Sequence, residues 1–182
     1  MSGPLKRRWL RFSLRTLLVI MTVLAISLGL YFKSLRDRKA AIGAMEKLGG
    51  AISLKYNGPE WLRKMVNDDK CFWNPVAVRF QPHHPITDQE LQSAVPYLKN
   101  FGDLNYLAFR ESQVTNEGLK HLLPLAERLL VLDLSDTAVS DDGIVHLKQL
   151  PKLMFVRVKE GTAITPAGIG EFERALPGCK CN

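Results

Sequence analysis

A short pattern recurs with a fixed period over the carboxy-terminal part of the chain, and it constrains the fold more than any other feature. A glycine, the aliphatic residue after it and an apolar residue three positions further on return every 25 residues. The set is Gly118, Leu119 and Leu122, then Gly143, Ile144 and Leu147, then Gly168, Ile169 and Phe172. A period of this length is typical of architectures in which similar units stack on one another.

Each unit also contains a predicted strand ahead of its glycine. The apolar pattern there is Leu-x-x-Leu-x-Leu, formed by Leu104, Leu107 and Phe109, by Leu129, Leu132 and Leu134, and by Leu153, Val156 and Val158. This spacing sends the apolar side chains into a shared core and leaves the residues between them on the solvent side. A more divergent unit precedes these three, with Val78, Phe80, Ile86 and Leu91. We therefore expect four strand–helix units stacked as a solenoid.

A hydroxyl residue opens each predicted helix. The four are Thr87, Thr115, Ser140 and Thr165, and we expect their oxygens to accept hydrogen bonds from the amides of the first helical turn. Glu90 completes a capping box with Thr87, and Pro166 takes a first helical position. Asp88, Asp141 and Asp142 suit the positive end of a helix. We expect the repeated glycines to allow a close approach of the first turn to the strand layer.

An uncharged segment, residues 16–32, lies between Arg15 and Lys33. As a helix it would be about 26 Å long, slightly less than a bilayer core, and flanking cations and aromatic residues can cover the difference. This predicts a membrane anchor over residues 14–33. A cleaved signal peptide is the alternative, with a small-residue site at residues 25–27, although the apolar run continues past it. Five cations precede the segment and four follow closely, which leans toward a cytoplasmic amino terminus.

The chain has 182 residues and a net charge of +7, but this charge is concentrated at one end. Residues 1–47 carry ten Lys and Arg against two acidic residues, while the whole chain carries 25 against 18, so the remainder has a net charge of −1. The basic character therefore belongs to the membrane segment and its flanks, and it predicts no nucleic-acid partner.

The region between the anchor and the repeats reads as a mixed α/β cap. The predictions there are a helix over residues 37–48 ended by two glycines, a strand over 51–56, a turn at 57–59, a short helix over 60–66, a polar loop at 67–70 and a strand over 76–80. The predicted organisation is a basic tail (1–13), the anchor (14–33), a juxtamembrane helix and cap (34–74) and the repeat domain (75–182).

The repeats resemble the leucine-rich repeat proteins, and within them a bacterial, membrane-anchored subgroup. The subgroup motif Thr-x-Val-Thr-Asp-x-Gly-Leu corresponds to Ser112–Leu119, Thr137–Ile144 and Thr162–Ile169, and further likeness lies in Lys47–Gly50, Gly58–Arg63 and Ala175–Cys181. The resemblance implies a short α/β solenoid that serves as a binding scaffold. The chain departs from the wider family where Ser112 and Thr137 replace the usual Asn, and where an extra residue stands near Gly161.

No catalytic or metal-binding pattern emerges, and the sequence predicts no cofactor. Cys71, Cys179 and Cys181 lack zinc-site spacing and are read as free or partly buried thiols. His121, His146 and Glu171 occupy equivalent positions in neighbouring units, which are too far apart to share a metal ion unless side chains converge. His83 and His84 lie in a loop flanked by prolines. The chain contains no phosphate loop and no nucleophile elbow.

The exposed, concave face of the predicted sheet is the candidate binding surface. Its expected rows across the strands are Ala77, Tyr106, Val131 and Phe155, then Arg79, Ala108, Asp133 and Arg157, then Gln81, Arg110, Ser135 and Lys159. An aromatic row beside arginines has the composition of a protein-binding hot spot. The predicted contact residues are Arg79, Tyr106, Arg110, Asp133, Phe155, Arg157 and Lys159.

Three functional hypotheses follow. The leading one is a non-catalytic, single-pass membrane protein whose repeat domain lies outside and binds a protein partner. The second is a secreted or lumenal enzyme with a Cys or His centre. The third is a structural surface protein that associates with itself.

Overall fold

The computed structural model describes residues 13–58, 73–159 and 161–182. The predicted helix at 60–66, the loop at 67–70 and Cys71 lie outside these ranges. The chain forms two compact units, Met1–Arg36 and Asp37–Asn182, which are described separately.

Helix α1 (Leu14–Lys47) contains the apolar segment and the predicted helix at 37–48 as one uninterrupted helix of 34 residues. Its apolar side chains from Leu14 to Phe32 are exposed. Within the described residues it is the helix long and apolar enough to cross a membrane. In the second unit its last turns bury Ala41 and Met45 against the core, as their helical spacing predicts. Gly49, at a φ of 73°, follows the end of the helix.

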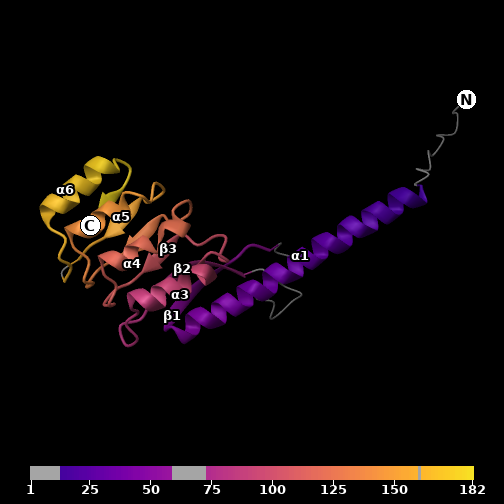
Figure 1. Ribbon diagram of the computed structural model, residues 1–182, viewed down its shortest axis with the longest axis horizontal. Coiled ribbons are helices and arrows are strands. Elements are labelled where there is room, and N and C mark those ends of the chain that lie inside the picture. Colours follow the sequence, from indigo (N-terminus) through magenta and orange to yellow (C-terminus); the bar gives the residue numbers. More distant parts are fainter. Residues whose placement is uncertain (1–12, 59–72, 160) are drawn as a thin grey trace, which may run out of the picture. The chain divides into compact units, whose positions relative to one another are not determined.

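The second unit is a mixed α/β fold built on a six-stranded sheet whose strands lie in chain order (Figure 1). The strands are β1 (Gly50–Tyr56), β2 (Trp73–Phe80), β3 (Tyr106–Ala108), β4 (Val131–Asp133), β5 (Phe155–Arg157) and β6 (Lys180–Cys181). Strands β1 and β2 pair antiparallel, and every later pair is parallel. The register between β1 and β2 shifts at Ser53 and Leu54, opposite Pro75, a residue without a ladder donor.

Helical segments connect successive parallel strands, as parallel pairing requires. They are α3 (Asp88–Leu98), then α4 (Asn116–Lys120) with η2 (Leu123–Leu125), then η3 (Asp141–Gly143) with α5 (Ile144–Leu147), and finally α6 (Pro166–Ala175). The apolar residues predicted to point inward from the strands are buried, except Val158, which is half-buried. Further residues at the same repeat spacing, Phe101, Leu125 and Leu150, which the sequence analysis did not single out, close the same core.

Neighbouring helix starts are joined by a repeated pair of hydrogen bonds. Thr115 donates its backbone N–H to Asp88 Oδ1 at 2.9 Å and its hydroxyl to Asp88 Oδ2 at 2.6 Å. Thr165 binds Asp141 in the same way, at 2.8 and 2.7 Å. These aspartates were expected to act on their own helix dipoles, yet their oxygens bind the cap residue of the next unit. We call this series the cap ladder.

The middle rung of the cap ladder joins Asn116 to Ser140 and corrects one predicted cap. Ser140 donates its N–H to Asn116 Oδ1 at 2.9 Å, and its hydroxyl oxygen accepts from Asn116 Nδ2 at 2.8 Å. The Ser140 side chain therefore makes no capping bond to its own helix, contrary to prediction. The other three caps are confirmed, because Thr87, Thr115 and Thr165 each accept from a first-turn amide, Thr87 in a full capping box with Glu90.

The repeated glycines make room for the cap ladder, and the expectation that they approach the strand layer is wrong. A Cβ at Gly118 would lie 2.1 Å from Asp88 Oδ1, and one at Gly168 would lie 2.1 Å from Asp141 Oδ1. At Gly143 it would lie 2.6 Å from Asn116 Oδ1. Glycine therefore recurs every 25 residues because a cap-ladder side chain of the preceding strand–helix unit lies where its Cβ would be.

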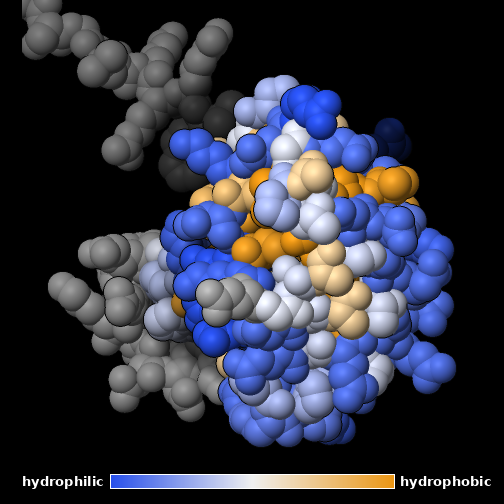
Figure 2. Space-filling model, turned by 90° about the vertical axis from the view of Figure 1, so that its left-hand side faces the viewer, coloured by the Kyte–Doolittle hydropathy of each residue, from blue (hydrophilic) through white to orange (hydrophobic). Residues whose placement is uncertain are grey.

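Strand β6, absent from the predictions, closes the sheet at its α6 end. Half-buried Val158, Ile164, Leu176 and Cys181 pack against the core near this end, and Figure 2, which views it, shows apolar residues within a mostly hydrophilic surface. Lys180 and Asn182 donate their N–H groups toward β5, whereas Cys181 donates its N–H to Glu173 Oε1 at 3.2 Å. A donor on the outer edge of the sheet is thereby satisfied from α6.

Two glycines of the same helix, α6, test the steric explanation of the 25-residue glycine period. Gly168→Ala should destabilise the protein, because its Cβ collides with Asp141, and Asp141→Ala in the same chain should remove much of that penalty. Gly170→Ala is the matched control, since nothing lies within 4 Å of its Cβ position. That change should be neutral or stabilise the helix by up to about 1 kcal/mol. Thermal unfolding of the native chain and the three variants measures this, and equal effects at Gly168 and Gly170 would refute the steric account.

Candidate functional site

The strand registers define the rows of the exposed sheet face. Ala77, Tyr106, Val131 and Phe155 pair in one row, and Arg79, Ala108, Asp133 and Arg157 pair in the next, in the order that the sequence predicts. The third row contains Arg110, Ser135 and Lys159 and lies just beyond the last paired residues of the strands. At this level Glu111 donates its N–H to Ser135 O at 3.1 Å.

The first row is apolar and only partly covered. Tyr106, Val131 and Phe155 are half-buried, whereas Ala77 is buried. The guanidinium of Arg79 lies over the Tyr106 ring at 5.1 Å from its centroid, a cation–π contact that orients both side chains. Arg79 is exposed, and its Nη1 also donates to Ser53 Oγ at 3.5 Å.

Two further apolar residues lie next to this row in the chain, and the sequence reasoning did not single them out. Met154 is 60% exposed and Leu130 is half-buried. Their backbones are adjacent, because Met154 donates its N–H to Leu130 O at 2.8 Å. Each directly precedes a row residue, Val131 or Phe155, and successive residues of a strand point to opposite faces. We call the half-buried row residues Tyr106, Val131 and Phe155 the apolar strip.

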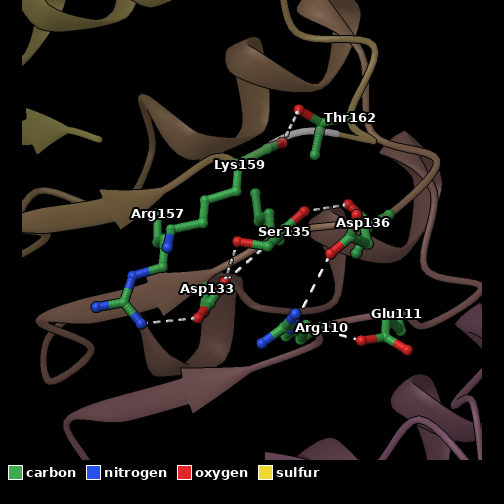
Figure 3. A network of polar contacts seen from close by, with 10 residues as sticks. Arg110, Glu111, Asp133, Ser135, Asp136, Arg157, Lys159 and Thr162 are labelled. Carbon is green, nitrogen blue, oxygen red and sulfur yellow. Dashed lines mark hydrogen bonds and ion pairs between the residues drawn. The ribbon is translucent and has the colours of Figure 1, made fainter.

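Asp133 lies beneath the face rather than on it. Its exposed fraction is 4%, and Oδ1 accepts from both the N–H and the hydroxyl of Ser135, at 3.1 and 2.7 Å. Oδ2 accepts from Arg157 Nη1 at 3.2 Å (Figure 3). The Arg157 side chain is 42% exposed, so Asp133 holds one nitrogen of a guanidinium whose remainder reaches solvent. Asp133 was predicted as a contact residue, and its burial suits an orienting role instead.

Arg110 is held at its inner nitrogen by two acidic residues that the sequence reasoning did not single out. Its Nε lies 3.3 Å from Glu111 Oε1 and 3.7 Å from Asp136 Oδ2, while the side chain is 62% exposed (Figure 3). Glu111 and Asp136 have φ of 56° and 57°, and Gly161, the next residue at this spacing, has 99°. The 25-residue period could have revealed this left-handed turn, because glycine occupies its last copy.

Lys159 completes the basic part of the face. Its side chain is exposed, and within the described ranges it forms no ion pair with a carboxylate. Its backbone carbonyl accepts from Thr162 Oγ1 at 3.3 Å. The predicted contact residues thus fall into two groups, an apolar strip at one end of the strands and three arginines and a lysine toward the other.

The two described cysteines are poorly suited to nucleophilic chemistry. Burial, followed by the nearby Glu173 carboxylate, raises the pKa of Cys179 to about 11. Burial, followed by Cys179 and Glu173, raises the pKa of Cys181 to about 12. A nucleophilic cysteine needs a lowered pKa, because the thiolate is the reactive form.

The histidines and acidic residues do not converge on a metal site in the part of the chain that the structure describes. His83 and His84 are exposed, and Glu171 pairs with Lys148 at 2.6 Å. A hollow of about 430 Å³ lies beside α3 and α4, lined by apolar residues and cations such as Val95, Leu123 and Lys99. Its lining contains no carboxylate and no cysteine.

The chain matches no protein-family model, and no curated protein is significantly similar to it.

Thiol reactivity tests the role of Cys179 and Cys181. In a Cys71→Ser chain at pH 8, iodoacetamide should alkylate Cys179 roughly a hundredfold and Cys181 roughly a thousandfold more slowly than an unperturbed cysteine, because raised pKa values reduce the thiolate fraction. The rate should rise as the pH approaches 11 and should become ordinary in denaturant. Mass spectrometry measures the labelling, and rapid labelling of the folded chain would restore the case for a cysteine-centred activity.

Proposed function

We propose that this protein is a membrane-anchored leucine-rich repeat protein that binds a protein partner through the exposed sheet face and has no catalytic activity of its own. The repeat domain faces the outside of the cell in this proposal, and the amino terminus stays in the cytoplasm. The observation that carries the proposal is the apolar strip, which stays partly exposed beside oriented arginines.

The repeat assignment rests on agreement between the sequence period and the structure. Strand–helix units pair in parallel, the cap ladder joins their helix starts, and the left-handed turn returns every 25 residues. Stacked units of this kind present one row of side chains per strand position, and such surfaces commonly serve as contact faces.

The anchor assignment rests on α1, whose apolar turns are exposed in the chain and are flanked by Arg15 and Lys33. A helix with this composition is stable in lipid, where its backbone groups are satisfied internally. The flanking cations also favour anionic headgroups, by about 1 kcal/mol each near such a surface.

Partner binding is favoured over the two other functions for specific reasons. Buried, high-pKa thiols and the absence of a metal cluster among the described residues give an enzyme no identifiable centre. Self-association through the β6 edge of the sheet is opposed by Glu173, which already accepts the outward N–H of Cys181. Sedimentation of the full chain in detergent distinguishes self-association through other surfaces, which would show a mass that rises with concentration.

Membrane attachment predicts the behaviour of the chain on extraction. The full chain should remain in the membrane pellet after alkaline carbonate treatment, whereas a chain beginning at Asp37 should appear in the supernatant. The intact mass of the pelleted protein is the second readout. A mass lacking the residues up to Ser27 would show that the apolar segment is cleaved as a signal peptide.

The sheet face predicts which substitutions abolish binding. A chain with Tyr106→Ala, Arg110→Ala and Phe155→Ala should lose partner crosslinks in cells, because it removes two apolar anchors and one oriented guanidinium. A chain with Tyr97→Ala, Lys99→Ala and Leu123→Ala is the matched control, since it also removes one tyrosine, one cation and one apolar side chain, from exposed positions outside the sheet face. Crosslinks that persist in the first chain, at unchanged thermal stability, would exclude the sheet face as the binding surface.

A further inference from the structure

On the sheet face the carboxylates are engaged by neighbouring side chains, whereas the cations are engaged only in part. This difference indicates the chemistry of a partner. Asp133 is buried, and both of its oxygens are occupied by hydrogen bonds to Ser135 and Arg157. Glu111 and Asp136 both turn toward Nε of Arg110. The side chains of Glu111 and Asp136 are 45% and 38% exposed, but an oxygen of each lies within 3.7 Å of Arg110 Nε. The acidic groups of the face are therefore all engaged with its arginines.

The cations, in contrast, keep much of their binding capacity. Arg157 is held through Nη1 and Arg110 through Nε, so each guanidinium retains further N–H donors on its exposed part. Within the described residues, Arg79 and Lys159 form no ion pair with a carboxylate, and both are exposed. Figure 3 shows Arg110, Arg157 and Lys159 around Asp133 at the ends of neighbouring strands.

The spacing of these groups sets the dimensions of a matching ligand. Arg79 on β2 and Arg157 on β5 are separated by three strand spacings, about 14 Å in total. The row that contains them lies two residues along the strands from the row of Tyr106 and Phe155, about 7 Å away. The surface thus presents a basic row and an apolar row that run side by side across the strands.

We propose that the partner contributes an acidic segment in which carboxylate side chains alternate with large apolar ones. Its carboxylates bind Arg79, Arg110, Arg157 and Lys159, and its apolar side chains cover the apolar strip. This proposal rests on the proposed function, because it specifies what the same face binds. Guanidinium groups held from one side match the planar, two-oxygen geometry of a carboxylate.

A nucleic acid fits this surface less well than an acidic protein segment. Most of its affinity would come from phosphate contacts along an extended basic track. The chain after residue 47 has a net charge of −1, and the basic row occupies only one edge of a partly exposed apolar strip. A single-stranded oligonucleotide is therefore a competitor in the test rather than the proposed ligand.

Peptide selection with a charge-reversed variant tests the proposal. Random twelve-residue peptides displayed on phage are selected on the full chain in nanodiscs of zwitterionic lipid. A second selection uses a chain with Arg79→Glu and Lys159→Glu, the two cations whose replacement breaks no ion pair in the described structure. Lys99→Glu with Arg174→Glu, outside the sheet face, is the matched control with the same change in net charge.

The expected result is a change of ligand charge that follows the surface charge. The native chain and the control should select peptides rich in Asp and Glu together with Leu, Phe or Trp, and the charge-reversed chain should select basic ones. A selected acidic peptide should bind the native chain about tenfold more weakly when Arg110→Gln and Arg157→Gln are introduced, and its affinity should fall as salt is added.

The outcomes separate this proposal from the proposed function. If selected peptides depend on Tyr106 and Phe155 but are neutral or basic on the native chain, the acidic partner is refuted and the binding face survives. The same conclusion follows if oligo(dT) binds the face more tightly than any selected acidic peptide. If peptides bind equally well to the variant lacking Tyr106, Arg110 and Phe155, the sheet face itself is refuted as a binding surface.

Discussion

The hydrogen bonds between consecutive helix starts are the interaction on which the fold of residues Asp37–Asn182 depends. Each rung of the cap ladder satisfies a cap residue of one unit with the side chain of the unit before it, through both the backbone N–H and the hydroxyl. Hydrogen bonds of this kind to an ionised carboxylate are stronger than neutral ones. The rungs therefore fix the spacing of the units as well as their orientation. Pro166 stands where the next ladder side chain would be, so the series ends at Thr165.

The arrangement of the exposed sheet face follows from this regular spacing. Because successive units repeat the same strand–turn–helix arrangement, equivalent strand residues lie in register, and Tyr106, Val131 and Phe155 form one continuous row. The same repetition stacks the left-handed residues Glu111 and Asp136 close enough for both to approach Arg110. The cap ladder thus holds the helix starts, while the outward strand residues Tyr106, Val131 and Phe155 stay partly exposed on the sheet face.

Much of the fold could be predicted because it depends on local chemistry and on periodicity. The strand residues with Leu-x-x-Leu-x-Leu spacing, the capping box of Thr87 and Glu90, and the helical face of Ala41 and Met45 all follow from positions within one segment. The rows of the sheet face also followed, since a fixed period implies a fixed register. What failed were statements about contacts between units. The glycine positions were assigned to the strand layer, and Ser140 was assigned a capping bond that it does not form.

The sequence by itself determined the order of strands and helices, the apolar amino-terminal helix and the register of the rows across the sheet. Each of these depends on spacing along the chain or on the composition of a continuous segment. Only the tertiary structure decided which groups meet across units, because those contacts join residues 24 to 27 positions apart whose side chains carry no shared signal. It placed Asp133 beneath Arg157, turned Glu111 and Asp136 toward Arg110, and left Met154 exposed beside Phe155. The physical reason is that burial and hydrogen-bond pairing depend on neighbours in space. The Asp133 carboxylate, predicted from the sequence as a contact residue, is buried and orients Arg157 instead.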